Sequence, residues 1–351
     1  MRSSIAFTNR RNGSKRVSTQ LDASVNFPHW SLSLCGANVL FGHDCPERSE
    51  RLRRLLHELF VVSAEEPRKY TAPLRIHFSP EHDTQFATET KLLSDASGLR
   101  VESLPGGFVL DCQTARLHID VVGGVGRGDF QDSFFRLPKD QQRRFLLLAL
   151  VMLFRRDQRF ALHAGGIVTR DGQGCLIAGR SGSGKTTLGL SLIQQGWSYL
   201  SDDVVVLHQD ENRANEIDAF GINRGLACTP ETAKRFQHRL RCPDRFGEKW
   251  ITQLNGATRV TAAVCRPHLL LFPIIGNRST SQLILLSPLE AMNELIQFSA
   301  GIMTHRKEAT RQLQVLNRLV AQSRAFRMIA GRDVLECPQQ VAKLLRHATE
   351  R

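Results

Sequence analysis

The sequence predicts an α/β protein with a glycine-rich loop in its larger second part and a small α+β module in front of it. From residue 160 onward the apolar segments and turns follow the order strand, turn, strand, glycine-rich loop, helix, strand, which is typical of an α/β core. Before residue 138, short apolar strands surround one amphipathic helix. We therefore divide the chain into residues 1–20, 21–138 and 139–351.

Composition excludes several classes of protein. The chain has 351 residues, of which 41% are hydrophobic and 8 are cysteines, as in ordinary globular proteins rather than disordered, collagen-like or disulfide-rich ones. The longest apolar run, residues 145–154, is about half of the roughly 20 residues that cross a bilayer, so no membrane span is expected. The cysteines form no CxxC pair, which argues against a zinc site and favours a reducing, cytoplasmic location.

The net charge of +13 is concentrated at the two ends of the chain. Residues 1–20 contain five basic and no acidic side chains, and residues 301–351 contain ten basic and four acidic ones. This distribution predicts a disordered basic tail and a basic surface helix, not a nucleic-acid groove. Residues 1–20 also have the composition of a transit peptide, but no amphipathic face persists along them.

The pattern of residues 21–138 predicts one helix and several strands. The helix covers residues 46–60 and places Leu52, Leu55, Leu56 and Leu59 on one face. Strands are expected at 30–40, 74–78, 107–110 and 117–122. The segment GGVGRG at 123–128 does not have GxGxxG spacing, so we interpret it as a glycine-rich turn.

Residues 139–351 carry the α/β pattern. Helices are expected at 139–156, 185–195, 288–298 and 305–322, the third opened by Ser287-Pro288. Strands are expected at 161–168, 175–178, 204–207, 269–272 and 282–286, with a further short strand just before the Asp202-Asp203 pair.

The segment from Gly179 to Thr186 matches the pattern G-x-x-x-x-G-K-[ST] and stands between a predicted strand and a predicted helix, as a phosphate-binding loop requires. Its glycines let backbone N–H groups turn toward a polyphosphate at the positive end of the helix dipole. Lys185 would reach the outer phosphates and Thr186 would offer a hydroxyl to Mg²⁺. The residues predicted to bind ATP are Gly179, Arg180, Ser181, Gly182, Ser183, Gly184, Lys185, Thr186 and Thr187.

Two acids and a histidine flank this loop in the sequence. Asp202 and Asp203 follow Lys185 by 17 and 18 residues, at the end of a short strand. One such carboxylate can hold Mg²⁺ while the other accepts the proton of an attacking hydroxyl. His163 lies in the preceding strand, where an imidazole beside Asp202 would orient that acid. An Asp-Asp turn and a structural histidine are the alternatives.

Three segments in this order and at these distances, LHAGGIV, GRSGSGKTTLGLSLIQQGW and YLSDDVVVL, resemble the catalytic domain of HPr kinase/phosphorylase. Residues 30–300 more loosely resemble the HPr kinase-related proteins, including the HprK-related kinase B group. The resemblance implies a phosphate-loop core of the HPr kinase C-terminal type, with Lys185 and the loop on ATP and Thr186 on Mg²⁺. It also implies Asp202 as the base oriented by His163, and Asp203 near the metal, while the sequence leaves open which of the two acids has which role.

The resemblance has limits in this chain. Glu216 is similar to another metal-associated glutamate of the family, although it falls closer to the Asp pair than in the family. The family signature for the dephosphorylating reaction is not recognisable, and residues 21–138 do not match the family's regulatory domain. Phosphorolysis, a hexamer and HPr itself as substrate therefore do not carry over.

The function expected from these features is ATP-dependent phosphoryl transfer to a hydroxyl, on Ser or Thr of a protein or peptide. A homo-oligomer is compatible with the sequence, and no nucleic-acid or membrane partner is expected. Two alternatives stay open, namely a regulatory or scaffold protein that binds ATP without transfer, and a small-molecule kinase or ATPase. The acceptor itself is not identified by the sequence.

Overall fold

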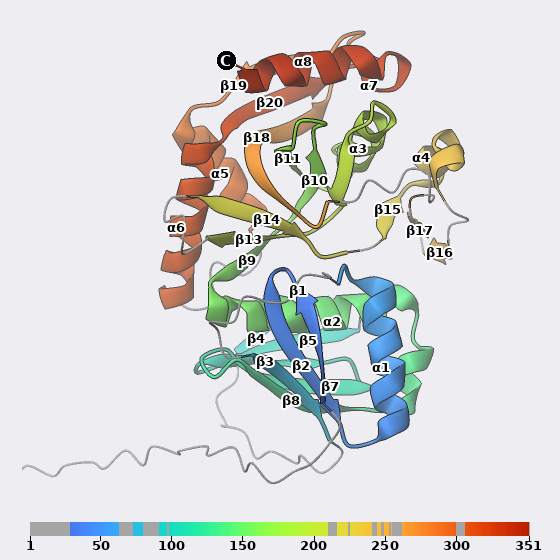
Figure 1. Cartoon of the computed structure of the whole chain (residues 1–351), viewed down its shortest axis with the longest axis vertical. Coiled ribbons are helices and arrows are strands. Elements are labelled where there is room, and N and C mark those ends of the chain that lie inside the picture. Colours follow the sequence, from blue (N-terminus) through green and yellow to red (C-terminus); the bar gives the residue numbers. More distant parts are fainter. Residues whose placement is uncertain are drawn as a thin grey trace, which may run out of the picture.

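The computed structural model describes residues 29–62, 73–79, 91–96, 98–209, 216–223, 225–240, 244–246, 249–252, 254, 262–299 and 306–350. The predicted basic tail, residues 1–20, lies outside this part of the chain. The protein is a mixed α/β structure with two large sheets and several helices (Figure 1). The described helices include none that is long and apolar enough to cross a bilayer.

The first sheet has eight strands in the order β1-β2-β3-β8-β7-β6-β5-β4. Buried and exposed residues alternate along β3 and β7, so one face of the sheet is in the core and the other faces solvent. The expected glycine-rich turn at 123–128 is confirmed only at Gly123 and Gly124, because residues 125–128 belong to β8. The strands are β1 (His29–Leu34), β2 (Ala37–His43), β3 (Leu74–Phe78), β4 (Lys91–Ala96), β5 (Leu99–Leu104), β6 (Gly107–Asp111), β7 (Ala115–Asp120) and β8 (Val125–Phe130).

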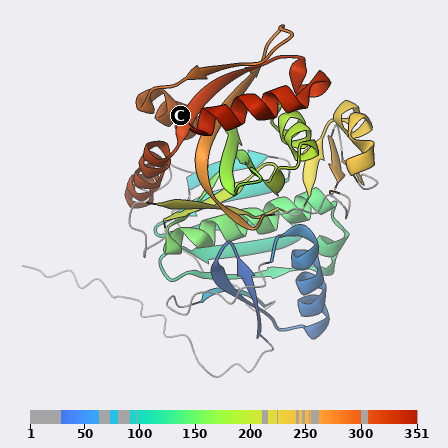
Figure 2. The same cartoon turned by 45° about the horizontal axis from the view of Figure 1, so that its top comes forward.

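Two helices cover the buried face of the first sheet. The predicted helix at 46–60 is confirmed as α1 (Pro46–Leu59), whose leucine face is buried. The predicted helix at 139–156 is α2 (Lys139–Phe154), and it lies between the two large sheets (Figures 1 and 2). Short 3₁₀ turns, η1 (Asp132–Arg136) and η2 (Arg155–Asp157), precede and follow α2.

Helix α2, which the expected division at residue 138 places in the second part of the chain, packs against the first sheet. Phe145, Leu150 and Phe154 of α2 are buried in the same hydrophobic cluster as the first sheet. Val206 and Ile222 of the second sheet enter that cluster from the other side. Because α2 fills the space between the sheets, the chain passes from one to the other only after residue 157, and not before α2.

The second sheet has nine strands, and the glycine-rich loop leaves it from a central one. Its main order is β12-β10-β11-β18-β14-β13-β9, with β20 on β18 and β19 on β20. β11 runs parallel to β18, and β18 parallel to β20. The predicted single strand at 161–168 is interrupted at His163. The strands are β9 (Arg159–Leu162), β10 (Ala164–Val168), β11 (Gln173–Ala178), β12 (Ser198–Ser201), β13 (Val205–Gln209), β14 (Ile217–Gly221), β18 (Val264–Ile275), β19 (Gln282–Leu285) and β20 (Arg324–Ala330).

Helices cover both faces of the sheet at β11 and β18. Because side chains on both faces are therefore buried, these strands are made of continuous apolar segments. Leu176 and Ala178 pack toward α5 (Pro288–Gln297) and α6 (Arg306–Gln322). Cys175 and Ile177 pack toward the opposite layer, which consists of α3 (Lys185–Gln194), α7 (Asp333–Glu336) and α8 (Pro338–Glu350). Figure 2 shows α8, in red, crossing the near side of the sheet. The predicted start of α5 is confirmed by a capping box between Ser287 and Glu290.

A small subdomain that the sequence pattern does not predict lies beside α3. It is a three-stranded sheet in the order β15-β17-β16. Strand β15 contacts α3, and β15 is the element that reaches the candidate site described below. The elements are β15 (Leu226–Cys228), α4 (Pro230–Arg235), η3 (Gln237–Arg239), β16 (Asp244–Phe246) and β17 (Lys249–Thr252).

Arg159 joins the two large sheets and should matter for stability. Its buried guanidinium donates hydrogen bonds to the carbonyls of Cys35, at 3.0 Å, and Gly36, at 3.1 Å. We expect Arg159→Leu to lower the free energy of unfolding by about 2–3 kcal/mol, because it leaves buried carbonyls without donors. Urea denaturation measures this change.

The matched control is Arg54→Ala in α1, which removes an ion pair to Glu50 on a side chain that is 77% exposed. An exposed pair of this kind should change the free energy of unfolding by less than about 0.5 kcal/mol. Equal, small effects for both variants would contradict the role given to Arg159.

Candidate active site

The glycine-rich loop joins the end of β11 to the start of α3. Gly182 and Gly184 have φ angles of 83° and 90°, which L side chains rarely adopt. Gly184 is the residue before the first turn of α3, so the loop closes directly onto the N-terminus of this helix. The unpaired backbone N–H groups of a helix start, together with its dipole, favour an anion at this place.

Lys185 lies folded over the start of the loop. Its ammonium donates hydrogen bonds to the carbonyl of Gly179 at 2.5 Å and to that of Arg180 at 3.0 Å. The positive charge is therefore held beside the first two residues of the loop, within reach of an anion bound there.

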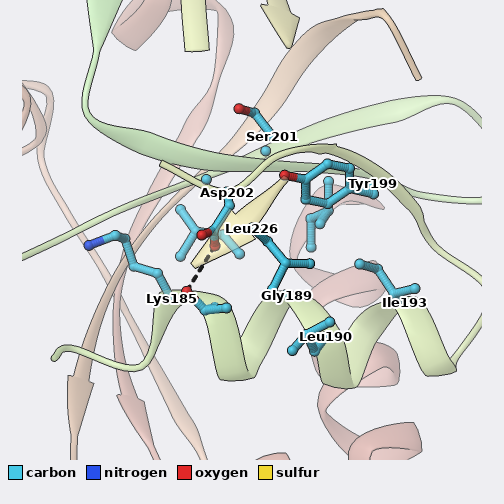
Figure 3. A pocket seen from close by; sticks show the side chains of 13 residues that line it. Lys185, Gly189, Leu190, Ile193, Tyr199, Ser201, Asp202 and Leu226 are labelled. Carbon is cyan, nitrogen blue, oxygen red and sulfur yellow. Dashed lines mark hydrogen bonds between the residues drawn. The ribbon is translucent and has the colours of Figure 1, made fainter. Parts of the chain in front are cut away.

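Asp202 is tied to the first turn of α3 and to β15. The Thr186 hydroxyl donates to Asp202 Oδ1 at 2.8 Å (Figure 3), and the Ala227 N–H donates to Asp202 Oδ2 at 2.8 Å. Asp202 is only 9% exposed. Burial raises the pKa of Asp202 to about 6, against the opposing effect of the Ala227 N–H and the Thr186 hydroxyl.

A small cavity lies beside this carboxylate, between α3 and β12. Its volume is about 20 Å³, and Tyr199, Thr186 and Asp202 are among its lining residues (Figure 3). The Tyr199 hydroxyl donates to the carbonyl of Gly225 at 3.3 Å, and burial raises the pKa of Tyr199 well above its ordinary value. A cavity of this size holds about one water molecule.

His163 contacts Asp203 rather than Asp202, which corrects the expected pairing. His163 Nδ1 lies 3.2 Å from Asp203 Oδ1, and both side chains are partly exposed. The two acids are consecutive residues at the end of β12, and their side chains reach different partners. Asp202 meets the first turn of α3, and Asp203 meets the junction of β9 and β10. Thr186, the expected magnesium ligand, thus contacts Asp202 and not Asp203.

Strand register brings His163 to the start of the loop. Ala164 of β10 is paired with Ala178 of β11 in an antiparallel ladder, so His163 follows on beside Gly179. The His163 N–H donates to the carbonyl of Phe298, at the end of α5, at 2.8 Å. The backbone at His163 and at Gly179 therefore continues from the last residue pair of this ladder.

Glu216 does not join this cluster, which corrects the expected metal role. Its carboxylate forms an ion pair with Arg266, at 2.7 Å. The register of the β13–β14 hairpin pairs Val205 with Gly221 at one end and Gln209 with Ile217 at the other. Glu216, next to Ile217, is thus at the opposite end of the hairpin from Asp203. The stretch from Val205 to Gln209 alone spans roughly 13 Å, and Asp203 and Glu216 lie beyond its two ends.

The oxygen atoms of Thr186 and Asp202 suit Mg²⁺. Within the described residues, no group of three or more His, Cys, Asp or Glu side chains gathers as a metal site. Mg²⁺ commonly takes one or two carboxylates and completes its shell with waters and substrate phosphates. One buried carboxylate and one hydroxyl, adjacent to an anion-binding loop, fit that requirement.

Two contributors were missed by the sequence analysis. Ala227 acts through its backbone N–H, which no residue pattern reveals. Gly165 allows the close approach of β12, because a Cβ atom there would lie 3.0 Å from the carbonyl oxygen of Asp202. The two glycines after His163 in LHAGGIV were the signal available for this second contribution.

Comparisons with known proteins identify one class of relative. No protein-family model matches the chain. Curated proteins named HPr kinase/phosphorylase match over 80 residues, 20% of this chain. The one from Pelodictyon phaeoclathratiforme is 38% identical with 24% of its length covered, and the one from Chlorobium phaeobacteroides is 41% identical with 25% covered. Over this segment the chain is HPr kinase/phosphorylase-like, and the match spans about a quarter of these relatives' length.

A solved structure, the Hpr(Ser) kinase/phosphatase from Coxiella burnetii, also matches. It has 14% identity and a TM-score of 0.28, covering 54% of this chain and 95% of that one. Similarity at this level is too low to support a statement about the fold.

The buried Asp202 should make stability depend on pH in metal-free protein. The folded state holds the Asp202 proton up to about pH 6, whereas the ordinary pKa is 3.8. The free energy of unfolding therefore falls as pH rises through this window. Because Asp202→Asn cannot ionise, we expect it to gain stability relative to the wild type between pH 4 and 7, by up to about 3 kcal/mol.

Urea denaturation in the presence of EDTA at several pH values measures this difference. Asp171→Asn, at an exposed turn, is the control and should follow the wild-type profile at every pH. A stability difference between Asp202→Asn and wild type that does not vary with pH would contradict the effect of burial on Asp202.

Proposed function

We propose that this protein is an ATP-dependent kinase that transfers a phosphoryl group to a Ser or Thr hydroxyl of a protein or peptide. The observation that carries the proposal is the contact of His163 with Asp203 at 3.2 Å, because His163 directly precedes β10, which pairs with β11, the strand that leads into the phosphate-loop sequence. The similarity to proteins named HPr kinase/phosphorylase supports the same reaction class. The free thiols of the described cysteines support a reducing, cytoplasmic setting.

The loop and Lys185 would bind the phosphates. Backbone N–H groups at the start of α3 provide donors in a fixed geometry, so little reorganisation is needed when an anion enters. The Lys185 ammonium, now on the carbonyls of Gly179 and Arg180, would turn to the outer phosphates. Its charge would stabilise the negative charge that builds up on the leaving oxygen.

Thr186 and Asp202 would hold Mg²⁺ at the first turn of α3. Bound Mg²⁺ with ATP supplies a reactive phosphoryl group whose charge is partly neutralised. Asp202 is oriented for this task by the Ala227 N–H. Because burial disfavours its ionised form, a cation would lower the energy of the carboxylate and compensate that penalty.

Asp203 would act as the general base. Its carboxylate is 44% exposed and so is accessible to an acceptor hydroxyl, unlike the buried Asp202. The His163 imidazole contacts Asp203 Oδ1 at 3.2 Å and would orient this carboxylate. Asp203 would accept the proton of the hydroxyl as the hydroxyl oxygen attacks phosphorus. This exchanges the two aspartate roles that the sequence had implied.

Substitutions of the two aspartates should have different effects on transfer and on Mg-ATP binding. We expect Asp203→Asn to lower kcat for transfer by about 100-fold or more, the usual contribution of a general base, with little change in the Kd of Mg-ATP. Asp202→Asn should instead weaken Mg-ATP binding and raise the Mg²⁺ concentration needed for half-maximal activity. Calorimetry and transfer of labelled phosphate to short synthetic peptides with a central serine measure these effects.

Lys185→Ala is the reference for lost phosphate binding and should reduce both the affinity for Mg-ATP and transfer. Full transfer by Asp203→Asn would refute its assignment as the base. Tight Mg-ATP binding by the wild type with no transfer to any acceptor would favour the non-catalytic alternative.

A further inference from the structure

Tyr199 carries a buried hydroxyl that the function proposed above does not use. The residue lies on β12 and is only 6% exposed. The chain has 19 phenylalanines and 2 tyrosines, and its buried aromatic rings are mostly phenylalanines. Burying a hydroxyl is unfavourable unless the group is hydrogen-bonded. Packing of the ring therefore does not explain why this position holds a tyrosine.

The Tyr199 hydroxyl lies between two segments of the active site. Figure 3 shows it pointing from β12 toward Asp202. It donates to the carbonyl of Gly225, the residue before β15, at 3.3 Å. Burial and the nearby Asp202 carboxylate raise the pKa of Tyr199, and a hydrogen bond from the Asp202 backbone acts against them. The hydroxyl thus keeps its proton in neutral solution and can join the start of β15 to Asp202.

Strand β15 brings one residue to both proposed Mg²⁺ ligands. The Ala227 N–H donates to Asp202 Oδ2 at 2.8 Å, and the Thr186 hydroxyl lies 3.4 Å from the Ala227 carbonyl oxygen. β15 has three residues, and the strand paired with it in the described part of the chain is β17. The side of β15 that faces α3 is therefore held by contacts such as the one between Tyr199 and Gly225, two residues before Ala227.

We propose that Tyr199 is a positioning residue of the kinase, whose hydroxyl holds the start of β15 so that the Ala227 N–H keeps the Asp202 carboxylate oriented for Mg²⁺. In this role Tyr199 acts through Asp202 and is not a ligand of the metal or of the phosphates. Groups that orient a metal ligand commonly change metal affinity by about 10–100-fold when they are removed. The inference rests on the proposed function, because Asp202 is a metal ligand only in that proposal.

The first test is the Mg²⁺ requirement of Tyr199→Phe, which removes the hydroxyl and keeps the buried ring. In calorimetric titrations at fixed ATP, we expect the Mg²⁺ concentration at half-saturation to rise by about tenfold, because Asp202 loses its fixed orientation. The Kd for ATP in EDTA should stay within about twofold of the wild type, because the loop and Lys185 bind the phosphates without Asp202. In the Asp202→Asn background, Tyr199→Phe should change the Mg²⁺ requirement by less than about twofold, because the residue through which it acts is already replaced.

A second readout needs neither metal nor nucleotide. In EDTA, hydrogen exchange of the Ala227 amide followed by NMR should become at least about tenfold faster in Tyr199→Phe, since the strand that carries this amide is held less firmly. Exchange of the Leu176 amide reports the stability of the whole sheet, because Leu176 is buried in β11 between β10 and β18. We expect the Leu176 amide to exchange as in the wild type.

The matched control is Thr169→Val, which also removes a buried hydroxyl that is bonded to the backbone. Thr169 is 4% exposed, and its hydroxyl accepts the Gln173 N–H at 2.9 Å. It lies in the turn between β10 and β11, at the other end of these strands from the glycine-rich loop. The Mg²⁺ requirement and the Ala227 exchange of this variant should match the wild type. Equal changes in both variants would overturn the role of Tyr199, since they would reflect only lost stability.

Failure of the kinase function and failure of this inference give different results. Absence of Mg-ATP binding by the wild type would overturn the kinase function itself. If the wild type binds Mg-ATP, an unchanged Mg²⁺ requirement in Tyr199→Phe would overturn only the role of Tyr199. An effect that persists in the Asp202→Asn background would overturn it as well, as would exchange at Leu176 that accelerates as much as exchange at Ala227.

Discussion

The buried carboxylate of Asp202 is the constraint on which the arrangement of the site depends. It joins the end of β12 to the first turn of α3 through Thr186 and to β15 through the Ala227 N–H. A buried carboxylate without such partners would be strongly unfavourable, so these three segments are held together by the need to satisfy one group. The same burial makes Asp202 a place where a cation would be favourable, because a positive charge offsets the cost of ionisation.

Consecutive residues on an extended chain point in opposite directions and can therefore contact different elements, as Asp202 and Asp203 do in this site. Asp202 is buried against α3, whereas Asp203 is partly exposed beside His163. Asp202 is thereby suited to bind a metal ion, and Asp203 is suited to accept a proton as a general base. The interruption of the strand at His163, between β9 and β10, places this histidine in contact with Asp203. The interruption of a predicted continuous strand is therefore part of the site.

The first sheet supports the side of the site that carries the proposed base. Val206 of β13 and Ile222 after β14 are buried in the hydrophobic cluster of α2 and the first sheet. The Val61 N–H donates to the Ile222 carbonyl at 2.8 Å, and Arg159 of β9 bonds to the β1–β2 turn. Strands β9 and β13 lead directly to His163 and Asp203. The position of these two residues thus depends on packing between parts of the chain more than 100 residues apart.

Elements with strong local signals could be predicted from the sequence alone. Helices α1, α2, α3 and α5 were predicted from leucine periodicity, from an apolar run, from the loop that precedes α3 and from the Ser287-Pro288 start. These signals act within a few residues, so no knowledge of the fold is needed. The short strands β15 to β17 carry no comparable pattern, and no helix was predicted at the position of α8.

The sequence by itself determined that a glycine-rich loop with Lys185 and Thr186 stands between a strand and a helix, and that two acids and a histidine belong near it. Only the tertiary structure decided that His163 meets Asp203, that Asp202 meets Thr186, that Glu216 pairs with Arg266 elsewhere, and that α2 packs on the first sheet. The physical reason is that side chains alternate between the two faces of any extended strand, and this alternation follows from the sequence. Which residues lie opposite each face depends on strand order and register, which only the fold determines.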